Sequence, residues 1–299
     1  MGFSESGNDV KRRWCALLGL FLTCSYVVGC RRTVNEAVEG TAIQNAGSDT
    51  MVNLALAWAE AYAPQRPEVR LSVTGGGSGT GIAALVQGTV DIANASRRIK
   101  AEETATAAAN NVVPVEHIVA RDAIAIVVHP SNPVDQLTIA QLSSIYRGDV
   151  TNWRQVGGED RPIVRLSRES NSGTHVYFLE QVVRRGVKED TSLFSPDTLL
   201  LPSSEGISAE VRQNPNAIGY DGLGYVTPDQ KVIAVARDAT GPYVLPTAES
   251  VNDDAYPIAR DLYMYTAGEP AGGIAAYLDW IMSDEAQTIV RTLGFVPLR

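Results

Sequence analysis

Short apolar segments alternate with segments of helical spacing from residue 41 to the end of the chain, and this alternation constrains the fold most. Val69–Thr74 and residues 163–166 have the period-two pattern or apolar character of strands. Residues 51–63 and 174–183 carry apolar side chains at helical spacing. Strands that alternate with helices form βαβ units. The sequence therefore predicts an α/β fold with a mostly parallel sheet.

Two strongly apolar segments divide this pattern into two parts. Residues 123–129 predict a buried strand that ends at the breaker cluster 130–133, PSNP, and residues 257–266 predict another. After the first of them the strand–helix pattern starts again, as expected of a second lobe. We expect these two strands to lie near the crossings between the lobes, and we expect a ligand cleft between the two lobes. The predicted division is lobe I, residues 41–128 and 255–299, and lobe II, residues 129–254.

The N-terminal segment has the features of an export signal. Lys11, Arg12 and Arg13 precede an apolar stretch, residues 14–28, that is too short to span a bilayer comfortably. The stretch ends in VVGC, which resembles the lipobox of bacterial lipoproteins, so we predict lipidation of Cys30. The alternatives are an ordinary signal peptide and an uncleaved anchor helix. We expect a signal peptide over residues 1–29, a tether over 30–40, and a periplasmic or cell-surface protein held to a bacterial membrane by its lipid.

Charge and cysteine content narrow the function further. The chain has 25 basic and 34 acidic residues, which argues against a nucleic-acid partner. Its three cysteines all lie within the first thirty residues, and its three histidines match no short metal motif. We therefore expect neither a metal nor a cofactor, and any anionic ligand must be attracted by a local site.

Three loops rich in Gly, Ser and Thr each open into a predicted helix, at residues 47–50, 75–81 and 168–174. The first turn of a helix has N–H groups without partners and a partial positive charge, so it can bind an anion. Glycine lets the backbone approach such a ligand, hydroxyl groups donate or accept, and Arg168 adds a guanidinium. Each loop alone fits a cap, a turn or a surface ion pair. Three of them together favour a site for an oxyanion.

These loops also carry a resemblance to a known family. GSDT at 47–50, GGGSGTG at 75–81, DIANASR at 91–97, LSSIYRGDVTNW at 142–153, SRESNSGT at 167–174, AIGYDGLGYV at 217–226 and GFVPL at 294–298 occur in the order found in the PstS phosphate-binding proteins of bacterial ABC transporters. The resemblance implies the two-lobed periplasmic-binding-protein fold of type II. It also implies capture of inorganic phosphate without catalysis, and delivery to an ABC transporter permease. We expect a monomer.

The resemblance also implies a set of phosphate-binding residues. They are Ser48, Asp49, Thr50, Ser78, Gly79, Ser96, Arg97, Arg168, Ser172, Gly173 and Thr174.

The chain departs from one branch of this family after Ser96. That branch has an Asp there, which accepts a proton from bound phosphate and so rejects sulfate, whereas this chain has Arg97. Asp49 or Glu169 is a candidate replacement for that acceptor. Sulfate and molybdate therefore stay open as alternative ligands.

Other classes of function are less well supported. GTGIAA at 79–84 fits a dinucleotide fingerprint, but no acidic residue closes a second strand about twenty residues later. An exported phosphate-ester hydrolase is the alternative of another class, with His175 as a possible base. However, neither Ser78 nor Ser172 lies in a G-x-S-x-G motif. A lipoprotein that binds only other proteins would show no ligand-dependent change in melting temperature.

Overall fold

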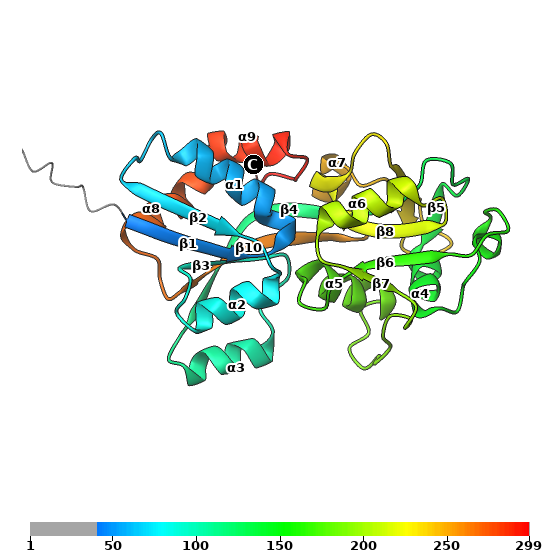
Figure 1. Cartoon of the computed structure of the whole chain (residues 1–299), viewed down its shortest axis with the longest axis horizontal. Coiled ribbons are helices and arrows are strands. Elements are labelled where there is room, and N and C mark those ends of the chain that lie inside the picture. Colours follow the sequence, from blue (N-terminus) through cyan, green and yellow to red (C-terminus); the bar gives the residue numbers. More distant parts are fainter. Residues whose placement is uncertain (1–40, 299) are drawn as a thin grey trace, which may run out of the picture. The chain divides into compact units, whose positions relative to one another are not determined.

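A computed structural model describes residues 41–298, which belong to one compact unit. The predicted signal peptide, Cys30 and the tether lie outside these residues. The described part is an α/β structure in two lobes, joined through the long strands β4 and β10 (Figure 1). The predicted fold class is therefore confirmed.

The first lobe contains the elements at the two ends of the described chain. They are β1 (Thr41–Gly47), η1 (Asp49–Met51), α1 (Val52–Tyr62), β2 (Val69–Thr74), α2 (Ser78–Val86), β3 (Ile92–Ala95), α3 (Ala101–Ala109), α8 (Gly272–Ile281) and α9 (Asp284–Thr292). The strands β4 (Pro114–Val128) and β10 (Ala259–Ala267) lead to the second lobe.

The second lobe contains the elements between β4 and β10. They are β5 (Gln136–Thr138), α4 (Ile139–Arg147), η2 (Trp153–Val156), β6 (Val164–Arg168), α5 (Gly173–Phe178), η3 (Leu179–Val183), β7 (Leu199–Leu201), α6 (Ser204–Gln213), β8 (Ala217–Gly222), η4 (Leu223–Tyr225), β9 (Lys231–Ala236) and α7 (Ala248–Asn252). The numerical lobe boundaries given above remain a prediction.

The strands follow the order β2-β1-β3-β10-β4-β8-β6-β7, with β9 paired to β4 and β5. Within the first lobe, β1 is parallel to β2 and β3, and within the second, β6 is parallel to β7 and β8. The crossing strands differ from the predicted pattern. β10 is antiparallel to β3 and β4, and β4 is antiparallel to β8 and β9, because β4 leaves the first lobe while β10 returns to it. The sheet is thus mixed rather than mostly parallel.

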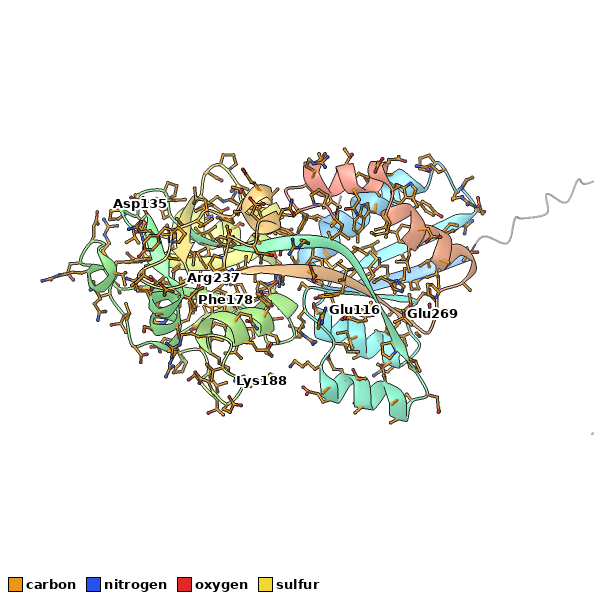
Figure 2. The ribbon with its side chains drawn as sticks, turned by 180° about the vertical axis from the view of Figure 1, so that it is seen from behind. Glu116, Asp135, Phe178, Lys188, Arg237 and Glu269 are labelled. Atoms are coloured by element: carbon orange, nitrogen blue, oxygen red, sulfur yellow. The ribbon has the colours of Figure 1, made fainter. Side chains whose placement is uncertain are left out.

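Each lobe has its own apolar core. In the first lobe, Trp58 of α1 is fully buried in an apolar cluster that also contains Tyr277 of α8 and Val290 of α9. In the second, the ring of Phe178, labelled in Figure 2, stacks on Tyr220 with centroids 3.7 Å apart. Apolar burial of this kind stabilises each lobe independently of any ligand. Among residues 41–298, no helix combines the length and the apolarity needed to cross a bilayer.

Two helices differ from their predicted bounds in ways that matter for the site. α2 begins at Ser78 rather than at residue 82, so part of the Gly-rich loop is already helical. The segment predicted as one helix over 174–183 is α5 followed by a π-helical turn, η3. Helix α6 was not predicted, because its Ser, Glu and Gly content resembles a loop.

Candidate functional site

The predicted loops follow the carboxyl ends of parallel strands. In the first lobe, the register of β1 with β3 places Gly47 opposite Asn94. Ser48 N donates to Asn94 O at 2.8 Å, and Gly77 N donates to Gly47 O at 2.8 Å. Parallel strands end at the same edge of a sheet, where open α/β sheets bind ligands. The loops after β1, β2 and β3 therefore meet at one place.

The hydroxyl groups of these loops form a buried group with those of α5, which we call the hydroxyl cluster: Thr50, Ser78, Ser96 and Thr174. Ser96 N donates to Ser78 Oγ at 3.0 Å, and the two Oγ atoms are 3.3 Å apart. Thr50 Oγ1 and Thr174 Oγ1 are 2.7 Å apart, although they come from different lobes. All four side chains are buried. The cluster therefore joins the lobes through groups that both donate and accept.

Gly173 lets α5 approach this cluster. A Cβ atom at this position would lie 2.3 Å from Ser78 Oγ and 2.5 Å from Ser96 Oγ, closer than real contacts allow. The neighbouring Ser172 caps α5, because its Oγ accepts from Thr174 N at 3.2 Å and from His175 N at 3.4 Å. In the first lobe, Ser48 Oγ is buried and has no hydrogen-bond partner among the described residues.

Arg168 forms an ion pair with Asp49 across the two lobes. Its Nη2 lies 3.0 Å from Asp49 Oδ2, and its Nη1 donates to Ser204 Oγ at 2.8 Å. Asp49 Oδ2 also accepts from Ser204 N at 3.0 Å. Two of the predicted ligand residues are thus bound to each other beside the hydroxyl cluster.

The Ser204 hydroxyl connects this ion pair to a deeply buried carboxyl group. Ser204 Oγ donates to Asp221 Oδ1 at 2.8 Å, while Asp221 Oδ2 has no partner among residues 41–298. Burial raises the pKa of Asp221 to about 7, although the Arg168 guanidinium opposes this shift. The network therefore contains a carboxyl group that changes charge near neutral pH.

Arg97 is paired differently from Arg168. Its guanidinium donates to both carboxylate oxygens of Glu103, at 2.8 and 2.6 Å, and to Arg98 O at 2.9 Å. Burial would raise the pKa of Glu103, but hydrogen bonds from Arg97 and from the Lys100 amide outweigh it and lower that pKa. The Arg97 guanidinium is thus paired with the Glu103 carboxylate. None of the hydrogen bonds recorded for Arg97 reaches the hydroxyl cluster.

Two charged residues at the cluster were missed in the sequence. Arg260 Nη2 donates to Thr174 Oγ1 at 3.0 Å, and its Nη1 donates to Ser96 O at 2.9 Å. Arg260 also binds Asp122 Oδ2 at 2.8 Å, with both side chains almost inaccessible. The sequence does contain a sign of this pair, because Asp122 lies beside one apolar predicted strand and Arg260 lies within the other. A charged residue buried in such a strand needs a partner of opposite charge.

Gly79 contacts the second lobe directly. Its N–H, in the first turn of α2, donates to Asn171 O at 3.1 Å. The Asn171 side chain also donates to Gly76 O at 2.8 Å. This predicted ligand residue therefore uses its amide in a contact between the lobes.

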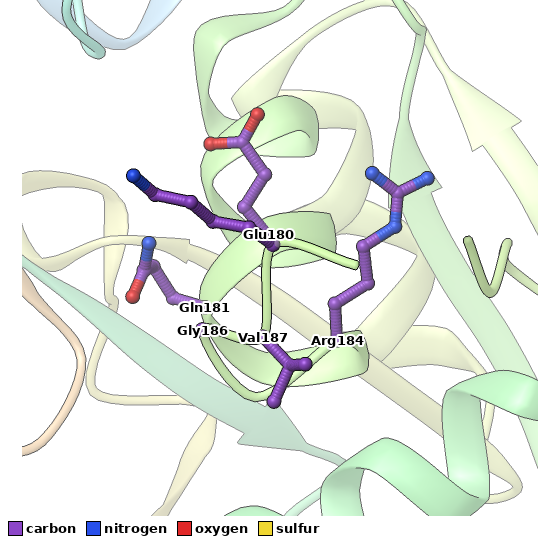
Figure 3. Close-up of a pocket in the computed structure, with 6 residues that line it drawn as sticks. Glu180, Gln181, Arg184, Gly186 and Val187 are labelled. Carbon is purple, nitrogen blue, oxygen red and sulfur yellow. The ribbon is translucent and has the colours of Figure 1, made fainter. Parts of the chain in front are cut away.

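Two cavities differ in their position relative to the hydroxyl cluster. One of about 630 Å³ is lined from the first lobe by residues including Arg97 and Arg260, and from the second by residues including Tyr177. A separate hollow of about 330 Å³ contains no residue of the hydroxyl cluster (Figure 3). That hollow is lined by Glu180, Gln181, Arg184, Gly186, Val187 and Lys188.

His175, the candidate base of the hydrolase alternative, makes its recorded ring contacts within the second lobe. His175 Nδ1 lies 2.8 Å from Arg168 O and 3.0 Å from Ser167 Oγ, within the second lobe. Burial lowers the pKa of His175, and the hydrogen bond to Arg168 O opposes that shift. The residue considered as a base is thus held on its own lobe. No group of acidic, His or Cys side chains within the described range could hold a metal ion.

Comparisons with known proteins identify relatives of this chain. A family model described as a PBP superfamily domain matches residues 34–285. The phosphate-binding protein PstS of Pseudomonas aeruginosa is 32% identical over 273 residues, covering 86% of this chain and 83% of that protein. PstS of Bacillus subtilis is 32% identical over 258 residues, covering 84% and 79%.

Solved structures show the same likeness. A phosphate ABC-transporter substrate-binding protein from Clostridium perfringens, solved with bound phosphate, has a TM-score of 0.77 and 31% identity, covering 87% of this chain and all of that one. An ABC-type phosphate transport receptor from Vibrio cholerae has a TM-score of 0.68 and 30% identity, covering 85% and 99%. This chain therefore belongs to the PstS family of phosphate-binding proteins, within the periplasmic-binding-protein superfamily.

Proposed function

We propose that this protein captures inorganic phosphate between its lobes, without chemical turnover, and delivers it to an ABC transporter permease. The observation that carries the proposal is the buried hydroxyl cluster, where Thr50 of the first lobe meets Thr174 of the second at 2.7 Å. Relatives named as phosphate-binding proteins, and a structural neighbour solved with bound phosphate, support the choice of anion.

The chemistry of the cluster fits a partly protonated oxyanion. Hydroxyl groups reverse their donor and acceptor roles, so they can bind both the P–O⁻ and the P–OH groups of phosphate. The start of α2 at Ser78 adds backbone N–H groups and a partial positive charge. Ser48 Oγ, buried without a partner among the described residues, supplies a further donor. We assign the phosphate contacts to the residues predicted from the sequence, except Arg97, which is paired with Glu103, and Gly79, whose amide contacts Asn171. We add Arg260 to this set.

Selectivity against sulfate requires a group that accepts a proton from the ligand. Glu169 is exposed, whereas Asp49 is adjacent to the hydroxyl cluster, so Asp49 is the stronger candidate. A carboxylate facing fully deprotonated sulfate would leave two acceptors opposed and unpaired. Asp49→Asn should therefore narrow the difference in affinity between phosphate and sulfate, while Glu169→Gln should not. Calorimetry with both anions measures that difference.

The main test of the proposed function is calorimetric titration of the mature chain with phosphate, after unfolding and refolding to remove bound anion. Thr174→Val removes the hydroxyl shared by Thr50 and Arg260, and should weaken binding by roughly 10- to 100-fold. Thr288→Val is the matched control, because Thr288 Oγ1 bonds only to Asp284 O of its own helix among the recorded contacts. Equal phosphate affinities for the two variants would contradict the assignment of the hydroxyl cluster as the phosphate site.

The same titration separates the remaining alternatives. If sulfate or molybdate binds more tightly than phosphate, that anion is the ligand. Steady hydrolysis of p-nitrophenyl phosphate by the purified chain, lost in Thr174→Val, would instead favour the hydrolase. We expect binding of phosphate and no release of p-nitrophenol.

We propose that the chain is exported, lipidated at Cys30, and held as a monomer at the outer face of a bacterial membrane. Cys30→Ala should move the protein from the membrane fraction to the soluble fraction and abolish incorporation of a labelled fatty acid. A variant that stays in the membrane would indicate an uncleaved anchor instead.

A further inference from the structure

Asn171 connects the lobes outside the hydroxyl cluster. It lies in the loop between β6 and α5, and it contacts both the loop between β2 and α2 and the first turn of α2. Its Nδ2 donates to Gly76 O at 2.8 Å, and its backbone O accepts from Gly79 N at 3.1 Å. Asn171 itself is exposed, so this contact lies at the rim of the lobe junction.

Local structure on both sides prepares this contact. Ser172 N donates to Glu169 O at 2.9 Å, which closes a tight turn and presents Asn171 to the other lobe. Gly79 N is one of the α2 first-turn donors that has no partner inside the helix. Asn171 O satisfies it, so the contact stabilises the helix start only when the lobes are together.

The glycines opposite Asn171 show how close the approach is. A Cβ atom on Gly77 would lie 2.8 Å from Asn171 O, whereas a Cβ atom on Gly76 would have nothing within 4 Å. Both glycines have positive φ, +102° and +117°, so an alanine would be strained at either position. Of the two, only Gly77 would direct an added methyl group against the second lobe.

We propose that Asn171, with Gly76, Gly77 and Gly79, forms a latch that sets the balance between open and closed lobes and so tunes affinity without contacting the anion. The inference rests on the proposed function. An anion that binds between closed lobes has an apparent dissociation constant equal to its intrinsic value divided by the closed fraction. Weakening the latch therefore lowers affinity while leaving the anion's own contacts intact.

The expected effects follow from these contacts. Asn171→Ala removes one exposed hydrogen bond and should weaken phosphate binding by about 3- to 10-fold, mainly through faster release. Gly77→Ala inserts a methyl group between the lobes and should weaken binding further. Gly76→Ala carries the same backbone strain without the obstruction, so its affinity should stay closer to that of the wild type. The ratio of phosphate to sulfate affinity should be unchanged in all three variants.

The test combines calorimetry, stopped-flow release and a distance measurement without ligand. The described residues contain no cysteine, so spin labels can be placed on Thr106→Cys and Lys188→Cys, one exposed residue in each lobe. The protein used is the mature chain from residue 30, with Cys30→Ser, which also lacks Cys15 and Cys24. In phosphate-free buffer, Asn171→Ala and Gly77→Ala should shift the distance distribution toward the open form relative to Gly76→Ala.

Unchanged distances, or Gly77→Ala and Gly76→Ala with equal affinities, would overturn the latch. A changed phosphate-to-sulfate ratio in Asn171→Ala would also overturn it, by making Asn171 a direct ligand. Failure of the wild type to bind phosphate would refute the proposed function alone, because the distance measurement tests the latch with no ligand present.

Discussion

Each arginine at the site is matched by a carboxylate. This matching explains how an acidic protein can build an anion site: the positive charges are neutralised locally, so hydroxyl groups and helix N-termini supply the attraction. The interaction is then short-range and depends on geometry rather than on net charge. The three pairs are Arg97–Glu103, Arg168–Asp49 and Arg260–Asp122.

Removal of one partner of the buried pair Arg260–Asp122 should destabilise the fold strongly. Arg260→Met leaves the Asp122 carboxylate buried without a counter-ion, and should lower the free energy of unfolding by about 3–5 kcal/mol. Adding Asp122→Asn should recover part of that loss. Urea denaturation measures both effects. Arg154→Met is the control, since its pair with Asp160 is exposed and should be worth less than about 1 kcal/mol. Equal losses in Arg260→Met and Arg154→Met would contradict the assignment.

Asp221 should make stability depend on pH. Its folded pKa, about 7, lies above its ordinary value of 3.8. Between these values the folded state holds a proton that the unfolded state has released, so the free energy of unfolding falls as pH rises from about 4 to 7 and then levels off. The charged groups that face Asp221 are Arg168 and Asp122, and Ser204 donates to it.

Asp221→Asn tests this dependence. The variant should lack the decline, and its stability relative to the wild type should rise between pH 4.5 and 7.5, as measured by urea denaturation. Taking the difference between the two proteins cancels the titration of groups they share. Parallel curves for the two proteins would show that Asp221 stays ionised throughout.

At the scale of elements, the site depends on where two helices begin. The sequence predicts the start of α2 at residue 82, because glycines have low helix propensity. In the structure α2 starts at Ser78, whose hydroxyl accepts from Ser96 N, so tertiary contacts extend the helix into the loop. Helix α5 is short and continues as the π-helical turn η3, a change of hydrogen bonding that periodicity cannot reveal.

Gly173, at the start of α5, should be intolerant of a side chain. Gly173→Ala places a methyl group against the Ser78 and Ser96 hydroxyls, and should weaken phosphate binding by roughly 100-fold or more because the lobes can no longer meet. Gly206→Ala is the matched control in the first turn of α6, where the new methyl group meets nothing closer than 3.5 Å. Calorimetry measures the phosphate affinity of both variants. Equal affinities would refute the close approach of Gly173 to Ser78 and Ser96.

At the scale of the whole molecule, a ligand held by both lobes should stabilise them together. Phosphate at a hundred times its dissociation constant should add about 2.7 kcal/mol to the free energy of unfolding. For a chain of this size that corresponds to a rise of about 5–10 °C in melting temperature. Scanning calorimetry with phosphate, and with sulfate at equal ionic strength, measures it. No difference between the two anions would argue against phosphate selectivity.

The sequence alone determined the α/β class, the family, and which loops carry hydroxyl groups, because strand and helix periodicity and local glycine-rich motifs are written in neighbouring residues. Only the tertiary structure decided which of those groups meet. It paired Arg168 with Asp49 and Arg97 with Glu103, and it brought Arg260 to Thr174 from a strand 86 positions away along the chain. Such contacts depend on how β4 and β10 connect the lobes, and residues distant in sequence give no local sign of it.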